Sequence, residues 1–315
     1  MSETITWLSA HALQVFLVAL VVLFFIVLAI SPRGAWSYAR VATLLIVGTV
    51  MMLPFVWLVC AAFKDKTVMN EFTFLPPPGK ISSETVNLNN YRTLFEAKPS
   101  VKGPVVFWQY IVNSVFLAAA GTFISLVFSS MGGYALAKYR FRGRTAIVTF
   151  MLASVTIPGV VLLAPNFEVI WRLGWMDTYR ALLIPGCVSV FGIFLFRQAM
   201  IGVPDDLIEA GRIDGCGEFR IYLTLIMPLV RPMIGAFCLI SFLGAWNSFI
   251  APNIYLQTQS KLTLPVVLNQ YIGEYAQQYG VFLAGTLLAI IPPAVLFFSL
   301  QREFISGLTS GAVKQ

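Results

Sequence analysis

The sequence predicts an all-α protein built as a polytopic membrane helix bundle. Two observations predict this class: the composition and the length of the apolar stretches. Of the 315 residues, 58% are hydrophobic and only 11% are charged, whereas about 25% are charged in an ordinary soluble domain. The apolar residues also form runs long enough to cross a bilayer, which takes about 20 residues of helix. A soluble globular protein, a disordered chain and a disulfide scaffold are therefore excluded.

Seven apolar windows predict seven membrane-spanning helices. They lie near residues 12–30, 41–62, 109–134, 145–165, 181–200, 227–250 and 280–300. No Lys or Arg precedes the first window, which is also longer than the usual apolar core of a signal peptide, so we interpret it as a retained helix. Several windows contain proline, and neighbouring helices or a water-lined cavity must satisfy the backbone groups that proline frees. This pattern favours a channel or transporter bundle over a simple anchor.

The distribution of Lys and Arg predicts the orientation. The loops on one side, 31–40, 138–144, 197–225 and 301–315, hold eleven basic residues. The short loops on the other side, 166–180 and 253–278, hold three. Six more lie in the long loop 63–108, but long loops translocate largely regardless of charge. We therefore expect an external N-terminus and a cytoplasmic C-terminus. The net charge of +7 reports this topology and does not indicate a nucleic-acid partner.

Residues for catalysis or metal binding are scarce. His11 is the only histidine, and the four cysteines, at 60, 187, 216 and 238, form no CxxC pair. The windows are nearly free of ionisable residues, which proton-coupled carriers place at mid-membrane. No GxxxxGK[ST] loop is present to bind ATP. We predict no catalytic residue, metal site or cofactor site in this chain, and expect the energy for any transport to come from elsewhere.

The loop 202–225 differs from its surroundings, with five acidic residues and two arginines. Pro204 suits the first position of a short helix. The following Asp205 and Asp206 then lie where the helix dipole favours negative charge. Two faces are predicted, a polar stripe of Asp205, Glu209 and Arg212 and a mostly small face of Leu207, Ala210 and Gly211. Such a helix could dock against another protein or serve as a solvated connector.

The same loop carries a recognisable pattern. Glu209-Ala210-Gly211, three residues, Gly215, nine residues and then Leu225-Ile226-Met227-Pro228 resembles the EAA loop of ABC-importer permeases, Glu-Ala-Ala, three residues, Gly, nine residues, Ile-x-Leu-Pro. Gly211 replaces the second Ala, and Leu225 and Met227 are conservative apolar replacements. Gly at 211 keeps the face small but loosens the helix by about 1 kcal/mol relative to Ala.

Three further segments agree with this resemblance. Tyr110 to Ser114 is similar to the start of the permease core, and Phe242–Phe249 (FLGAWNSF) and the ending Gln301–Lys314 resemble carbohydrate permeases of the MalG-like, maltose type. The resemblance covers about 41–315 and implies a six-span, type I permease core, with an added transmembrane helix and cytoplasmic linker in 1–40. Within the core it implies an external loop at 63–108, an ABC transmembrane type-1 domain at 109–302, a cytoplasmic EAA coupling loop at 202–225 and a cytoplasmic tail at 303–315.

The resemblance also implies a function. A member of this family is a non-catalytic permease subunit of an ATP-driven, binding-protein-dependent importer in the bacterial inner membrane. It would work with a second homologous permease, two copies of a cytoplasmic ATPase that binds ATP and Mg, and an extracytoplasmic solute-binding protein. The implied substrate is a sugar or oligosaccharide. The surface implied to couple to the ATPase consists of Glu209, Ala210, Gly211, Asp214 and Gly215.

Alternatives remain open for the pathway and the substrate. Trp246, Asn247 and Ser248 are candidates for lining the pathway, but Trp near a span end is often an interfacial anchor and Asn often bonds across helices. The same family type also serves glycerol-phosphate and polyol uptake. A secondary carrier would show repeated halves, and a membrane enzyme would need convergent polar groups. Neither is visible in the sequence.

Overall fold

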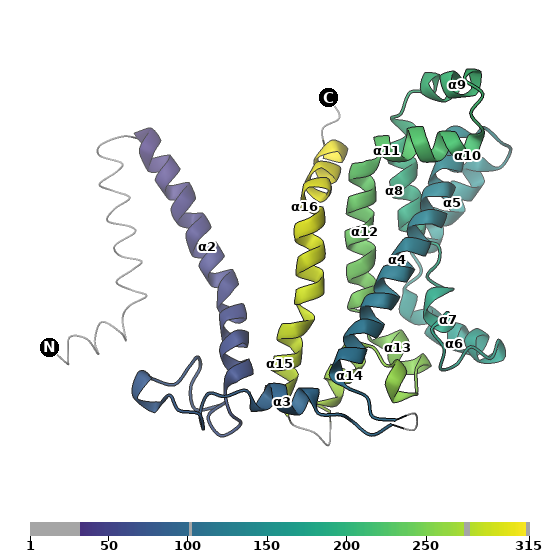
Figure 1. Cartoon of the computed structure of the whole chain (residues 1–315). Helices are drawn as coiled ribbons and strands as arrows, with labels where there is room; N and C mark the ends of the chain where they lie inside the picture. Colours follow the sequence, from purple (N-terminus) through teal and green to yellow (C-terminus); the bar gives the residue numbers. More distant parts are fainter. Residues whose placement is uncertain (1–31, 101–102, 274–277, 313–315) are drawn as a thin grey trace. The chain divides into compact units, whose positions relative to one another are not determined.

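The computed structural model describes residues 32–100, 103–273 and 278–312, with side chains at 36–100, 103–273 and 278–305. Helices make up its regular structure, and these residues contain no β-strand beyond two isolated bridges. The all-α prediction is confirmed. The chain divides into two compact units, Met1–Val86 and Asn87–Gln315, whose elements are labelled in Figure 1. The predicted helix at 12–30 lies outside the described residues.

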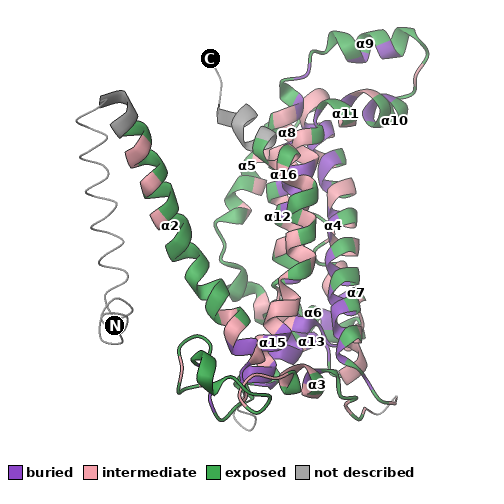
Figure 2. Cartoon of the chain, turned by 60° about the vertical axis from the view of Figure 1, so that its left-hand side comes forward, coloured by how far each residue is buried: buried purple, intermediate pink, exposed green. Residues whose placement is uncertain are grey.

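The first unit contains one long helix, α2 (Pro32–Phe63). Its stretch Trp36–Phe63 is long and apolar enough to cross a membrane, which matches the window at 41–62. Most of its described side chains are exposed and few are buried (Figure 2), as expected of a helix that faces lipid or another subunit. Just beyond it, the buried Lys64 donates hydrogen bonds to the carbonyl oxygens of Met69 and Phe72, and a 3₁₀ turn (η1) follows at Pro78–Lys80.

The second unit is organised around α4 (Phe107–Lys138). This helix packs against α8 (Val190–Ile201) and α12 (Arg231–Trp246), and α12 packs against α16 (Ile291–Ala312). Small residues permit this close approach, as is typical of helix pairs in membranes. A Cβ atom at Gly133 of α4 would lie 2.6 Å from the Cβ of Phe196 on α8. A Cβ at Gly192 of α8 would lie 2.5 Å from the ring of Phe237 on α12.

Two of the predicted spans are interrupted. The helix expected at 145–165 ends at Val155 (α5, Arg144–Val155), and the chain turns by 92° into the segment Gly159–Arg172, which comprises η2 (Gly159–Leu162) and α6 (Leu163–Arg172). The span expected at 181–200 consists of α7 (Arg180–Leu183) and the separate α8. Both interruptions have the same cause. Pro158 and Pro185 lie at the breaks, and proline cannot donate the hydrogen bond that a continuing helix needs.

The span predicted at 227–250 begins with prolines that the helix tolerates. The segment Glu218–Leu229 meets α12 at 83°, and Pro232 lies in the first turn of α12, where its missing N–H is not needed. Helix α15 (Tyr279–Ala289) and α16 together pass as one span, Tyr279–Ile305. Among the described residues, three helices are long and apolar enough to cross a membrane, or five if each bent pair is one span.

The predicted loops 63–108 and 253–278 are more structured than open connectors. The first contains α3 (Asn89–Phe95), and the second contains α13 (Ile250–Tyr255), η4 (Gln259–Lys261) and α14 (Leu264–Gln270). Helix α14 is apolar, and its Leu264 and Val267 are buried in the same cluster as Phe107 and Tyr110 of α4. The apolar residues of α14 explain why this segment packs into the unit.

Candidate functional site

The loop 202–225 forms a short helix, α9 (Asp206–Ile213), as its sequence predicts. The helix begins at Asp206, with Asp205 as the N-cap residue, two positions beyond Pro204. The carboxylate of Asp205 does not cap the helix, because Lys138 at the end of α4 donates a hydrogen bond to its Oδ1 at 2.6 Å. This contact holds the pKa of Asp205 below its usual range. Beyond the helix, the positive φ of 79° at Gly215 forms the turn that glycine permits.

The exposed and buried faces of α9 differ from those expected. Ile208 and Gly211 are buried, whereas Glu209, Ala210 and Ile213 are exposed. Spacings of three positions place residues 208 and 211 on one side of the helix, and 207, 210 and 213 on the other. The predicted small face of Leu207, Ala210 and Gly211 is therefore wrong as a unit, because Gly211 faces inward.

Gly211 allows α9 to lie against the segment that follows it. A Cβ at this position would lie 3.0 Å from Cδ1 of Leu225 and 3.2 Å from Cγ1 of Ile221. An alanine would therefore require these side chains to give way by a few tenths of an ångström. The departure from the second Ala of the EAA pattern thus has a local reason, which offsets the looser helix that glycine brings.

Two polar links hold the loop to the end of α4. Lys138, whose side chain is 7% exposed, donates both to Asp205 and to the carbonyl oxygen of Val203. Tyr139 donates to Glu218 Oε2 at 2.6 Å, and Arg212 Nε donates to Glu218 Oε1 at 2.7 Å. The predicted polar stripe is therefore divided, because Asp205 and Arg212 have separate partners.

The remaining residues of the predicted coupling surface face outward. Glu209, Ala210, Asp214 and Gly215 are exposed, and Glu209 makes no ion pair within the described residues. The surface beside them includes the apolar Ile213, which is 86% exposed. A free carboxylate next to an exposed apolar side chain can pair with a basic partner and still bury apolar area.

The segment after the loop changes its helix type before it enters α12. It runs as α10 (Glu218–Ile221), a π-helical turn (η3, Tyr222–Ile226) and α11 (Met227–Leu229). The π turn lies where the buried Tyr222 hydroxyl meets Ser130 Oγ of α4 at 2.6 Å. Single π turns often occur at functional sites, and this one joins the acidic loop to the helix core.

A cavity of about 380 Å³ lies in the same unit. It is formed where α4, α6, α7, α12 and α13 come together, near the opposite end of the unit from α9 (Figure 1). The described residues that line it are uncharged. They are Ser114, Leu117, Gly121, Gly159, Leu163, Asn166, Ala181, Leu182, Leu183, Pro185, Gly186, Ser241, Gly244, Ala245, Ser248, Ala251, Pro252, Tyr255 and Thr263.

Only one of the three pathway candidates lines this cavity. Ser248 does, together with residues 241, 244 and 245, which share one helical face through spacings of three and four. Trp246 is 4% exposed and stacks on Phe242, with ring centroids 5.9 Å apart. Asn247 is exposed and ends α12 as its C-cap residue. Trp246 is thus a core residue of this unit and does not face the cavity.

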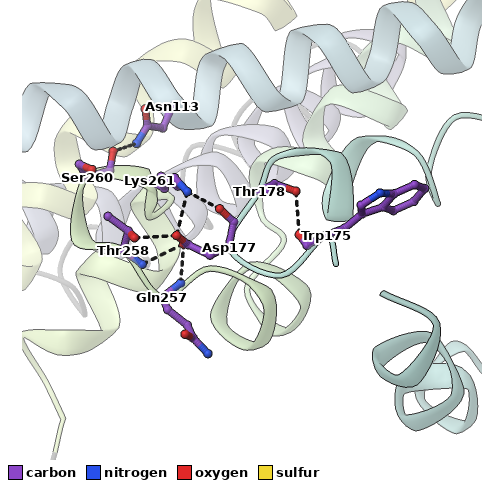
Figure 3. Close-up of polar contacts among 8 residues, drawn as sticks. All are labelled: Asn113, Trp175, Asp177, Thr178, Gln257, Thr258, Ser260 and Lys261. Carbon is purple, nitrogen blue, oxygen red and sulfur yellow. Dashed lines mark hydrogen bonds and ion pairs between the residues drawn. The ribbon is translucent and has the colours of Figure 1, made fainter. Parts of the chain in front are cut away.

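Polar contacts hold the segment 257–261 against α4 and the loop before α7 (Figure 3). The Asn113 amide donates to the carbonyl oxygens of Ser260 and Leu262 at 2.9 and 3.0 Å. Asp177, at the positive φ of 55°, accepts hydrogen bonds from the backbone and hydroxyl of Thr258 and pairs with Lys261 at 2.7 Å. Burial raises the pKa of Asp177, but the hydrogen bonds from Lys261 and Thr258 outweigh burial and hold this pKa well below its usual range.

Sequence reasoning missed Asp177, Lys261 and Thr263. The partners Asp177 and Lys261 are 84 positions apart, so no local spacing connects them. The one available signal was the polar sequence Gln257–Lys261 inside an otherwise apolar half of the chain. Within the described ranges, no three His, Cys, Asp or Glu side chains gather in a way that could hold a metal ion.

The bundle of spanning and broken helices, the braced acidic loop and the uncharged cavity together define a membrane-embedded permease subunit. Residues 129–306 match the family described as "Binding-protein-dependent transport system inner membrane component". The chain belongs to this family.

Sequence relatives agree with this assignment, and a solved structure shares the fold. The chain is 34% identical to the arabinooligosaccharides transport system permease protein AraQ of Halalkalibacterium halodurans, over 84% of this chain and 92% of that protein. It is 31% identical to the lactose transport system permease protein LacG of Rhizobium radiobacter, over 84% and 91%. The fold is similar to a chain of a bacterial ABC transporter involved in the import of the acidic polysaccharide alginate, with a TM-score of 0.72, 22% identity and coverage of 85% and 96%.

Proposed function

We propose that this chain is the permease subunit of an ATP-driven importer for a sugar or oligosaccharide, and that it forms half of the translocation pathway. The observation that carries the proposal is the spatial division of the second unit. An exposed acidic helix, α9, lies at one end, and an uncharged cavity lies near the other (Figure 1). The sugar assignment is supported by two relatives, 34% and 31% identical to this chain over the aligned residues, which are named for arabinooligosaccharide and lactose transport.

The basic loops support one orientation for this arrangement. Eleven Lys and Arg residues lie on the side of the loops 31–40, 138–144, 197–225 and 301–315, which by the positive-inside rule is the cytoplasm. Helix α9 then faces the cytoplasm, the cavity lies toward the outside, and the N-terminus is external. ATP and Mg would be bound by a partner ATPase, two copies of which would contact the cytoplasmic side. A second homologous permease would complete the pathway, and a solute-binding protein would deliver the substrate from outside.

Coupling runs through the contacts of α9. Glu209, exposed and without an ion pair within the described part of the chain, pairs with a basic group of the ATPase. Ala210, Asp214 and Gly215 form the surface around it. When the ATPases close, they displace α9, and the links from Lys138 and Tyr139 carry that displacement to α4. Gly211 contributes by holding α9 close to Ile221 and Leu225.

Two other functions are less well supported. Import of glycerol phosphate requires an anion to pass a cavity whose described lining carries no charge, and burying an unpaired anion is costly. A stand-alone secondary carrier would need its own coupling groups at mid-membrane, which the apolar spans do not supply.

The first test is affinity purification of the chain from its native membrane in mild detergent. A stoichiometric ATPase and a second, homologous permease in the eluate would support the importer. A chain that purifies alone and transports a sugar when reconstituted alone would contradict it and leave the secondary carrier.

A charge reversal tests the coupling surface. Glu209→Lys should leave membrane insertion intact and abolish uptake, because it places a cation opposite the basic group expected on the ATPase. Glu84→Lys, the same change at an exposed carboxylate of the first unit, is the matched control and should retain uptake. Wild-type uptake by Glu209→Lys would remove the assignment of α9 as the coupling element.

A further inference from the structure

A groove of about 420 Å³ lies between α4, α12 and α16. Each helix lines it with residues three or four positions apart, which share one helical face. The described lining of this α4–α12–α16 groove consists of Ala119, Thr122, Phe123, Leu126, Arg231, Ile234, Gly235, Cys238, Phe242, Leu296, Leu300 and Glu303. It is apolar apart from Thr122, Cys238 and two charged residues, so an occupant must be largely apolar as well.

The groove faces away from the uncharged cavity described above. Leu117 and Gly121 of α4 line that cavity, whereas Ala119 and Phe123 line the groove. A shift of two positions is about half a turn around a helix, so the two spaces lie on opposite faces of α4. Phe123 is 65% exposed. Because α4 is apolar and long enough to cross a membrane, the groove is open to lipid or to another membrane helix.

The charged residues of the lining lie at one end of the groove. Arg231 is the first residue of α12, and Glu303 is the last lining residue along α16. These parts of both helices lie at the end of the unit nearer α9 (Figure 1). From Arg231 to Phe242, the lining of α12 extends for about 17 Å, and the hydrocarbon layer of one leaflet is about 15 Å thick. The groove thus has the length and polarity of one membrane lipid, whose apolar chains carry a polar headgroup at one end.

Arg231 and Glu303 form an ion pair that leaves room for a ligand. Arg231 Nη2 lies 3.4 Å from Glu303 Oε1. This distance is longer than the usual 2.7–2.9 Å or so of a charge-assisted hydrogen bond and than the 2.6 Å between Lys138 and Asp205. The Arg231 side chain is 75% exposed. Gly235 lets Glu303 lie against α12, because a Cβ at Gly235 would be 2.5 Å from the Cβ of Glu303. A cation and an anion are therefore presented side by side at the end of the groove.

This pair of charges selects a class of headgroup. The guanidinium of Arg231 suits a phosphate, which it can bind with two parallel hydrogen bonds. An anionic headgroup would satisfy Arg231 but would bring its negative charge close to Glu303. A primary ammonium donates hydrogen bonds to a carboxylate, whereas the quaternary ammonium of phosphatidylcholine has no N–H group. Phosphatidylethanolamine carries a phosphate and a primary ammonium on neighbouring atoms of one headgroup, and so complements both residues.

We propose that the α4–α12–α16 groove binds one phosphatidylethanolamine molecule of the membrane. An acyl chain lies along the apolar lining, the phosphate binds Arg231 and the ammonium binds Glu303. This site goes beyond the proposed import function and does not depend on it, because it requires only that the chain is embedded in a membrane.

The first experiment identifies the occupant in the native membrane. The photoreactive residue p-benzoylphenylalanine is placed at Ala119, which is exposed and lines the groove, and in a control at Ala153, which is exposed on α5 outside the groove. After illumination, the mass of the purified chain should show phosphatidylethanolamine adducts at 119, enriched over other phospholipids relative to 153. A cross-link from 119 to another protein chain would overturn the proposal. The same mixture of phospholipid adducts at both positions would also overturn it.

The second experiment tests recognition of the headgroup. The complex is purified in mild detergent, depleted of lipid and titrated with phosphatidylethanolamine, phosphatidylglycerol or phosphatidylcholine, and native mass spectrometry counts the bound molecules. Arg231→Gln should weaken binding of phosphatidylethanolamine about tenfold, the size of one lost hydrogen bond to a charged group. Arg142→Gln, the same change at an exposed arginine outside the groove, is the matched control and should bind like the wild type.

Glu303→Gln tests the ammonium contact separately. It should reduce the preference for phosphatidylethanolamine over phosphatidylglycerol about tenfold, because it removes the partner of the ammonium and the repulsion of the anionic headgroup. Equal affinity of the wild type for the three lipids would refute the site, as would unchanged binding in both Arg231→Gln and Glu303→Gln. If the chain purifies without an ATPase, the same titration applies to the chain alone, so the lipid site and the importer are tested independently.

Discussion

The two ends of α4 hold neighbouring segments in different ways. Near its start, Asn113 and Ser114 are buried and make uncharged hydrogen bonds to the backbone of residues 260–264. At its end, Lys138 forms an ion pair with Asp205, whose side chain is 65% exposed. One end is thus fixed by buried amide and hydroxyl groups, and the other by a contact that solvent reaches.

This difference matches what each end is proposed to do. Buried neutral hydrogen bonds do not respond to salt, and breaking them leaves unsatisfied groups. Exposed ion pairs contribute little and weaken with ionic strength. Buried neutral hydrogen bonds suit a cavity wall that must keep its shape. A solvent-accessible ion pair suits a loop that is proposed to exchange partners when an ATPase moves. The following predictions test this contrast, beginning with the largest expected effect.

Disrupting the packing of α4 against α8, which lies between the two ends of α4, should destabilise both ends. Gly133→Ala would place a Cβ 2.6 Å from the Cβ of Phe196 and 2.9 Å from the backbone nitrogen of Arg197. Because backbone atoms cannot move away without shifting the whole helix, we expect the free energy of unfolding to fall by about 1–3 kcal/mol. Gly121→Ala, in the same helix, meets only Leu183 Cδ2 at an ordinary 3.6 Å and is the control. Thermal unfolding of both variants can be measured in detergent, with the exposure of cysteine thiols as the signal. Equal melting temperatures of Gly133→Ala and Gly121→Ala would contradict the packing account.

The next effect is at the buried end. Asn113→Ala removes the hydrogen bonds to the carbonyl oxygens of Ser260 and Leu262. It should lower the free energy of unfolding by about 1–3 kcal/mol, because the buried carbonyl oxygen of Leu262 loses its partner. Gln109→Ala is a sharp control. It removes a bond to the same Ser260 oxygen that Asn113 continues to satisfy, so its melting temperature should fall much less. A larger effect at Gln109 would show that Asn113 does not hold this segment.

Acid should weaken the same end of the unit through Asp177. Its folded pKa is depressed, so its stabilisation is fully present above the unfolded value of about 3.9 and is lost as pH falls below it. The melting temperature of the wild type should exceed that of Asp177→Asn at pH 7. The gap should narrow as pH decreases from about 5 toward 3. A gap that is constant with pH would show that the charge of Asp177 contributes nothing.

Sequence reasoning predicted the helical class and α9 because both depend on local patterns. Apolar windows and the spacing around Pro204 need no knowledge of distant residues. The prolines at 158 and 185 mark the breaks in the sequence, but they do not show how far the chain turns there, because a proline within a span can kink or end a helix depending on its neighbours. Gly211 was grouped with the small face of Leu207 and Ala210 because helical spacing alone does not show which residues another segment covers. Its inward direction depends on Ile221 and Leu225, which reach it only after the turn at Gly215.

The cavity depended still more on distant contacts. Ser248 could be identified as a candidate from its place in FLGAWNSF, but Trp246, only two residues earlier, lies on the other face of α12 and packs on Phe242. Thr263 has no distinguishing spacing. Its place in the cavity lining depends on its neighbours Leu262 and Leu264, which are bonded to Asn113 and Ser114, about 150 positions away.

The smallest effect on stability is expected at the exposed end. Asp205→Asn removes the charge but leaves Lys138 bonded to the carbonyl oxygen of Val203, so the melting temperature should change little and far less than in Asn113→Ala. Lys138→Met removes both contacts and should lower it more. Uptake per ATP hydrolysed, measured in proteoliposomes at low and high salt, should fall in Asp205→Asn at low salt and approach the wild-type value at high salt, where the wild-type pair is itself screened. A loss of stability equal to that of Asn113→Ala would mean that both ends are held alike, and that the loop end is a rigid support rather than an exchangeable contact.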